Sequence, residues 1–158
     1  MAERLAKKIL TTRDLLQIAE TIHRRVERHY REAAKRCEEP RTRLLLDFLR
    51  AREDEHRSIL SRYRRKSRED LLDAFFPHTP DEAQTAARLA SWRPAPKART
   101  EEVLSEVLEV DDRLEAFYRR AAEMAPNPQL GGLFESLANA MDAKRREVIR
   151  DAESLEDI

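Results

Sequence analysis

An internal repeat constrains the fold of this 158-residue chain more than any other feature. An offset of 88 residues, from Thr12 to Thr100, aligns the two halves without a gap. Identical aligned pairs include Leu16 and Leu104, Glu27 and Glu115, Tyr30 and Tyr118, Pro40 and Pro128, and Leu49 and Leu137. A repeated unit of this length buries its apolar face against its other copy. We therefore expect two similar hairpins related by a pseudo-twofold axis.

Each copy of the repeat has the apolar spacing of two long helices. The chain has only 2 Gly, which suits long helices better than a fold rich in tight turns. In the first copy, Thr11 and Asp14 match a capping box, and Thr12 is an alternative cap. The second helix is expected to start at Pro40, which favours a first helical turn, and to end near Arg65.

The second copy predicts a third helix from Thr100 to about Met124 and a fourth from about Pro128 towards the C-terminus. Between the copies, "SREDLLDAFF" predicts a short helix capped by Ser67, and "TPDEAQTAARLAS" another capped by Thr79. Helices joined by short, long and short connections predict an all-α four-helix bundle with one crossover. We expect one domain over residues 1–158, with hairpin one at 12–65, the crossover at 66–99 and hairpin two at 100–158.

Composition excludes several classes of protein. There is no apolar run long enough to span a membrane, and the start, "MAERLAKKIL", lacks a signal-peptide core, so we expect a cytoplasmic protein. The one cysteine, Cys37, falls on the apolar face of its helix and is expected to be a buried, inert thiol. Trp92 is expected to anchor the crossover over the bundle, and His29 and His78 are expected in surface or loop positions.

Charge is distributed unevenly along the chain. Residues 1–66 contain 19 Lys and Arg against 11 Asp and Glu, a net of +8, and the remainder balances this to zero. The basic maximum, Arg62 to Arg68, has no adjoining aromatic platform, so a solvated helix end is favoured over a nucleic-acid site. The opposite charges of the two halves favour a homo-oligomer, and we predict a dimer.

The stretch "LRAREDEHRSIL" contains Glu53 and His56, three positions apart on one helix face. Together, "VERHYREAA…FLRAREDEHRSIL" and "EVDDRLEAFYRRAAEM…LFESLANAMDAKRREV" resemble the two halves of a rubrerythrin-type ferritin-like domain over about residues 12–153. The resemblance implies a di-iron centre. In that family the first helix supplies a Glu seven residues before a Tyr, and the third helix supplies another Glu before its Tyr. The second and fourth helices each supply Glu-x-x-His.

Position by position, the implied centre is incomplete. The six positions hold His23 before Tyr30, the matching Glu53 and His56, Asp111 before Tyr118, and Met141 with Lys144 in place of the second Glu-x-x-His. Methionine is a poor ligand for a hard ferric ion, and lysine brings a cation into the space of a metal. We predict that the Lys144 ammonium pairs with Glu53 and Asp111 in place of the second metal.

Two functional hypotheses follow. The first is a ferritin-like protein with a degraded di-iron centre and no cofactor, which acts without catalysis through self-association or a partner. The alternative is an Fe- or Mn-dependent oxidoreductase or peroxide-handling protein with a one-metal or altered two-metal site. In the one-metal form His23, Glu53 and His56 would hold Fe, Mn or Zn. Other residues expected nearby are Glu20, Glu27, Tyr30, Glu115 and Tyr118.

Overall fold

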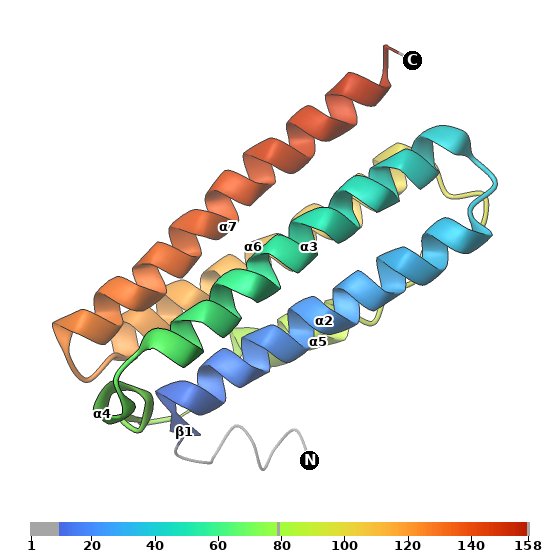
Figure 1. Ribbon diagram of the computed structural model, residues 1–158. Helices are drawn as coiled ribbons and strands as arrows, with labels where there is room; N and C mark the ends of the chain where they lie inside the picture. The colour runs from blue at the N-terminus through green and yellow to red at the C-terminus, as the bar shows by residue number, and fades with distance from the viewer. Residues whose placement is uncertain (1–9, 79, 158) are drawn as a thin grey trace.

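The computed structural model describes residues 10–78 and 80–157 and confirms the all-α four-helix bundle. Two long helical hairpins lie side by side (Figure 1). The four long helices are α2 (Thr12–Arg36), α3 (Pro40–Lys66), α6 (Thr100–Met124) and α7 (Pro128–Leu155). The short elements are β1 (Leu10–Thr11), α4 (Glu69–Leu72), β2 (Phe75–Phe76) and α5 (Glu82–Leu89).

The helix starts follow the sequence signals. Thr11 caps α2: its hydroxyl accepts a hydrogen bond from the Asp14 N–H at 3.2 Å, and the Asp14 carboxylate accepts from the Thr11 N–H at 3.0 Å. Thr11, and not the alternative Thr12, is therefore the cap. Pro128 opens α7 behind an Asn127 cap. These caps satisfy N–H groups that have no partner inside the helix.

The crossover differs from its predicted structure. Ser67 does not cap α4; it ends α3, and its N–H donates to the Tyr63 carbonyl, while Arg68 takes the N-cap position of α4. The prediction was wrong because α3 runs on to Lys66, so Ser67 is the C-cap residue of α3. The first turn of α4 begins only after Arg68. The predicted cap at Thr79 lies outside the described residues.

A two-residue strand pair also replaces part of the predicted short helix. Phe75–Phe76 pairs antiparallel with Leu10–Thr11, with Leu10 opposite Phe76. Both Leu10 and Phe76 are buried, so the pairing is stabilised by apolar burial as well as by backbone hydrogen bonds. This pairing ties the residues before α2 to the middle of the crossover.

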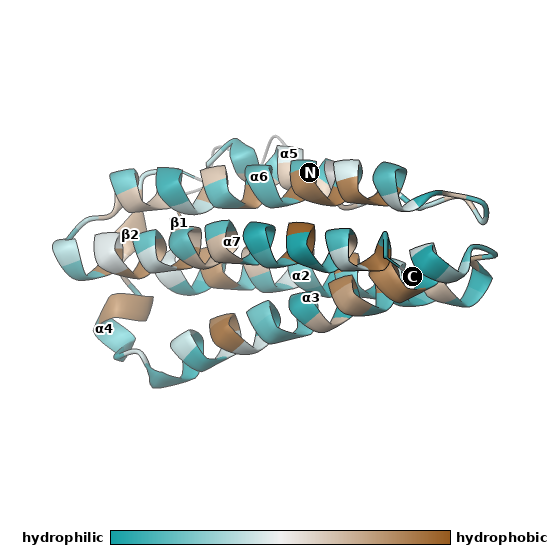
Figure 2. Cartoon of the chain, turned by 90° about the horizontal axis from the view of Figure 1, so that it is seen from above, coloured by the Kyte–Doolittle hydropathy of each residue, from teal (hydrophilic) through white to brown (hydrophobic). Residues whose placement is uncertain are grey.

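Packing of the two hairpins leaves two different seams. The α5 helix packs against α6 and α2 on one side of the bundle, and α3 packs against α7 on the other. Trp92 is partly buried against the core, as expected of an anchor, and Cys37 is buried as predicted. Figure 2 shows hydrophilic and hydrophobic residues alternating along each long helix, as amphipathic helices require. No described helix has the length and apolar character needed to cross a membrane.

Candidate functional site

Each long helix contributes one ionisable side chain to the centre of the bundle. These side chains, here called the central cluster, are His23 from α2, Glu53 from α3, Asp111 from α6 and Lys144 from α7. None is more than 1% exposed. Groups of this kind are found inside proteins only when they are paired and hydrogen-bonded, because burying an isolated charge is very costly.

The central cluster is held together by direct contacts. Lys144 donates through Nζ to Asp111 Oδ1 at 2.9 Å and also to Glu53 Oε1. His23 shares a hydrogen bond between Nδ1 and Glu53 Oε2 at 2.5 Å. Its other ring nitrogen, Nε2, lies 3.3 Å from the Tyr118 hydroxyl. Each oxygen of Glu53 therefore has a partner, and so does each ring nitrogen of His23.

Electrostatic interactions keep Glu53 of the first hairpin and Lys144 of the second hairpin charged. Burial acts to raise the pKa of Glu53, but the Lys144 ammonium and His23 oppose it and lower that pKa to about 2. Burial acts to lower the pKa of Lys144, but Asp111 and Glu53 outweigh it and raise that pKa overall. At neutral pH, Lys144 and Glu53 thus form a buried ion pair that joins the two hairpins.

Asp111 is less completely satisfied. Burial raises the pKa of its carboxyl, Lys144 acts in the opposite direction, and the Glu53 charge raises it further. Its second oxygen, Oδ2, is buried and has no hydrogen-bond partner within the described residues. Burial and the charges of Glu53 and Asp111 also raise the pKa of Tyr30 and of Tyr118, so both phenols stay protonated.

His56 lies beside the central cluster. Its ring stacks on that of His23, with centroids 5.8 Å apart and planes 21° from parallel. Burial, followed by the charges of Lys144 and His23, lowers the pKa of His56 to about 3. The imidazole of His56 is therefore neutral at physiological pH.

The glutamates expected near the site are paired with arginines. Glu20 lies 3.3 Å from Arg64, and Glu27 lies 3.4 Å from Arg50. Glu115, the repeat counterpart of Glu27, is bonded to arginines in the same way. These arginine partners were not predicted from the sequence. The two glutamates are seven residues apart on α2, but the two arginines are fourteen apart on the antiparallel α3, so residue spacing gave no matching signal.

These side chains do not fit a two-metal centre. The Lys144 ammonium lies against the carboxylates of Glu53 and Asp111 that such a centre would use, and it would repel a metal ion there. Met141 is completely buried and offers only a soft thioether. Between residues 10 and 157, Thr79 excepted, no three or more His, Cys, Asp or Glu side chains are arranged to hold a metal ion. The structure contains the predicted pairing of Lys144 with Glu53 and Asp111.

His29 differs from its expected surface position. It is half-buried, and its Nδ1 is buried and has no hydrogen-bond partner within the described residues. Burial, followed by the charge of Arg93, lowers its pKa. His78 is exposed in the crossover, as expected.

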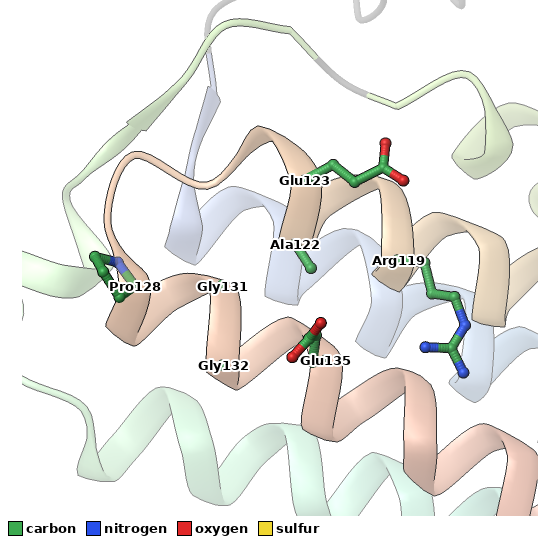
Figure 3. Close-up of a pocket in the computed structure, with 7 residues that line it drawn as sticks. All are labelled: Arg119, Ala122, Glu123, Pro128, Gly131, Gly132 and Glu135. Atoms are coloured by element: carbon green, nitrogen blue, oxygen red, sulfur yellow. The ribbon is translucent and has the colours of Figure 1, made fainter.

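A separate hollow of about 430 Å³ lies between the end of α6 and the start of α7. Figure 3 shows the seven residues that line it, none of which belongs to the central cluster. Gly131 and Gly132, which carry no side chains, are part of its lining. A Cβ at Gly131 would lie 3.7 Å from the Ala122 carbonyl oxygen, and one at Gly132 would meet nothing within 4 Å. Neither glycine is therefore required by packing within the chain.

Comparison with known proteins supports the architecture. No family model matches the chain, and no curated protein matches it. The structure is similar to the crystal structure of a Thermotoga maritima protein provisionally described as a ferritin-like diiron-carboxylate protein. The TM-score is 0.59 at 16% sequence identity, and the match covers 91% of this chain and 95% of that one. A likeness at this identity concerns the fold alone, and on that basis the chain has the ferritin-like fold.

Proposed function

We propose that this chain is a rubrerythrin-type ferritin-like protein whose di-iron centre has been dismantled. It acts in the cytoplasm without catalysis, through self-association or a partner. The contact of the Lys144 ammonium with Glu53 and Asp111 is the observation that carries this proposal. The ammonium supplies positive charge to buried carboxylates, as a bound metal would, but it has no redox chemistry and no open coordination position.

The charge balance explains how the bundle can hold these carboxylates without a metal. Glu53 and Asp111 are almost completely buried, and unpaired they would destabilise the fold by several kcal/mol. Lys144 is attached to α7 and reaches both of them, so the positive charge is present whenever the chain folds. The protein therefore needs no metal to be stable.

Metal analysis tests the proposal. Protein purified without chelators and without a nickel column should contain far less than one Fe, Mn or Zn per chain. The matched control is the double variant Met141→Glu, Lys144→His, which restores the second Glu-x-x-His implied by the resemblance. This variant should gain metal in the same assay. Stoichiometric metal in the unaltered protein would contradict the proposal.

One observation favours the alternative of a one-metal oxidoreductase. The neutral His56 ring stacks on His23, which is bonded to Glu53, so residues of the types that bind Fe, Mn or Zn are neighbours, although the described side chains are not arranged to hold a metal ion as they stand. However, both ring nitrogens of His23 are already bonded, to Glu53 and to Tyr118. Peroxide consumption that disappears in Glu53→Ala would establish this alternative, whereas equal rates in both proteins would remove it.

A further inference from the structure

The seam between α3 and α7 carries an apolar groove of about 440 Å³. Residues Ile59, Tyr63, Leu137 and Ala140 line it together with the basic Arg62 and Lys66. The opposite side of the bundle differs, because α5 packs there against α2 and α6.

Two large apolar side chains are exposed towards the other end of α3. Leu44 is 40% exposed and Phe48 is 39% exposed. Residues four apart share a helix face, so Leu44, Phe48 and Arg52 lie in one row. Arg52 reaches across to Glu147 and Asp151 of α7, so this row lies along the same seam as the groove.

We propose that the α3–α7 seam is a dimer interface. A second copy of the chain packs on it about a twofold axis, and Leu44 and Phe48 of each copy enter the groove of the other. This inference rests on the proposed function, because it gives self-association a surface. Exposed apolar residues on the same seam as an apolar groove, on a chain rich in charged residues, are typical of such an interface.

The order of residues along α3 supports twofold symmetry. A twofold axis perpendicular to α3 and midway between Glu53 and Asp54 would place residue i opposite residue 107 − i of the other copy. The paired positions are then Leu44 with Tyr63, Phe48 with Ile59, and Arg52 with Glu55. Apolar residues thus meet apolar residues, and the row is complementary to itself.

Charges at the axis and at the ends fit the same arrangement. Arg52 and Glu55 already lie 3.8 Å apart within one chain, and across the axis each would meet the opposite charge of the other copy. The one like-charged pairing along the row is Arg41 with Lys66. It falls at the end of the bundle where α7 ends (Figure 1). Glu156 and Asp157, which follow α7, are exposed and acidic. These carboxylates would offset the excess of positive charge there.

Sedimentation of the full chain tests the interface. The unaltered protein should have twice the 18.5 kDa chain mass, and Phe48→Glu should lower this to the mass of one chain. The matched control is Phe75→Glu, because Phe75 is 68% exposed but lies in β2, outside the seam, and this variant should remain a dimer. Circular dichroism should show that each variant keeps the helical content of the unaltered protein.

Cross-linking tests which α3 residues of the two copies lie opposite each other, without a variant that disrupts the interface. Phe48→Cys combined with Ile59→Cys should give a disulfide-linked dimer on a denaturing gel, because the proposed axis places these positions opposite each other. Phe48→Cys alone should not, because its own copy would lie eleven residues along α3, about 16 Å away, and a disulfide needs Cα atoms within about 7 Å. The native Cys37 is buried and does not compete.

Two results would overturn the interface: a monomeric unaltered protein, or dimers that persist in Phe48→Glu and resist cross-linking in the double cysteine variant. Metal content, read on the same samples, separates this inference from the proposed function. A metal-free protein that dimerises elsewhere overturns only the interface. Stoichiometric metal in a dimer that Phe48→Glu dissociates overturns only the proposed function.

Discussion

Replacing Lys144 with methionine is the sharpest test of the central cluster. Methionine has nearly the length and volume of lysine, so the change removes the ammonium and leaves little empty space. Glu53 and Asp111 then lose the one lysine or arginine that is bonded to them among the described residues, while both stay almost completely buried.

The expected loss can be estimated in two ways. Lys144 and His23 together, acting against burial, lower the pKa of Glu53 from 4.5 to about 2, which corresponds to about 3 kcal/mol of stabilisation of the folded state for the two partners combined. Removing one partner of a buried ion pair generally costs about 3–5 kcal/mol. The single figure falls at the lower end of this range, and we expect Lys144→Met to lower the free energy of unfolding by about 3–5 kcal/mol near neutral pH.

The loss should depend on pH with a defined sign. In the unaltered protein, the contribution of Glu53 is present above its unfolded pKa of 4.5 and is lost as pH falls through about 2. In Lys144→Met, burial without the ammonium raises the carboxyl pKa values, so the folded state takes up protons on acidification. As pH falls, the variant therefore regains stability that it lacks at neutral pH. The difference in the free energy of unfolding between the unaltered protein and the variant narrows towards pH of about 4.

Urea denaturation followed by far-UV circular dichroism measures this difference, at one fixed protein concentration because the chain is expected to dimerise. With a slope of about 2 kcal/mol per M, the midpoint should fall by about 2 M near neutral pH. The matched control is Lys35→Met, an exposed lysine of α2, which should change stability by less than about 0.5 kcal/mol. An unchanged midpoint in Lys144→Met would refute the role given to the ammonium.

Three further predictions concern stability and ionisation. Gly131→Ala and Gly132→Ala should each raise stability by about 0.5–1 kcal/mol in thermal melts, because there is room for a Cβ at both; lower stability would show that the backbone needs glycine. Thr11→Ala should cost about 1 kcal/mol by urea titration, because it removes the cap of α2, and a change below about 0.3 kcal/mol would argue against the cap. The ring protons of His56 should show no NMR titration between pH of about 8 and 5, because its pKa is about 3; a midpoint near its usual value would contradict the burial of the ring.

The long helices could be predicted because their signals are local. Thr11, Pro40 and Pro128 mark helix starts through their own chemistry, and the repeat gave each half the support of the other. The β1–β2 pair could not be predicted, because two strands of two residues each have no periodicity. That pairing depends on Leu10 and Phe76, which are far apart in sequence and meet only in the folded core.

At the site, the repeat was enough to align the helices but not to assign each contact. The resemblance, carried over position by position, predicted that Lys144 would meet Glu53 and Asp111, because all three occupy positions of the implied metal centre. It did not show that His23 would bond Tyr118, because that contact depends on the rotation of α2 against α6. The stacking of His56 on His23 depends on how the two imidazole rings are rotated, and residue spacing in the sequence does not determine that rotation.

The distribution of the central cluster over four helices has a consequence for folding. Each hairpin brings its own pair, His23 with Glu53 in one and Asp111 with Lys144 in the other, and the contact of Lys144 with Glu53 forms only when the hairpins dock. A slip of one helical turn, about 5.4 Å, would leave Glu53 buried without its ammonium. We infer that hairpin formation, which needs only local contacts, precedes docking. The buried charges then select one register from those that the apolar faces alone would tolerate.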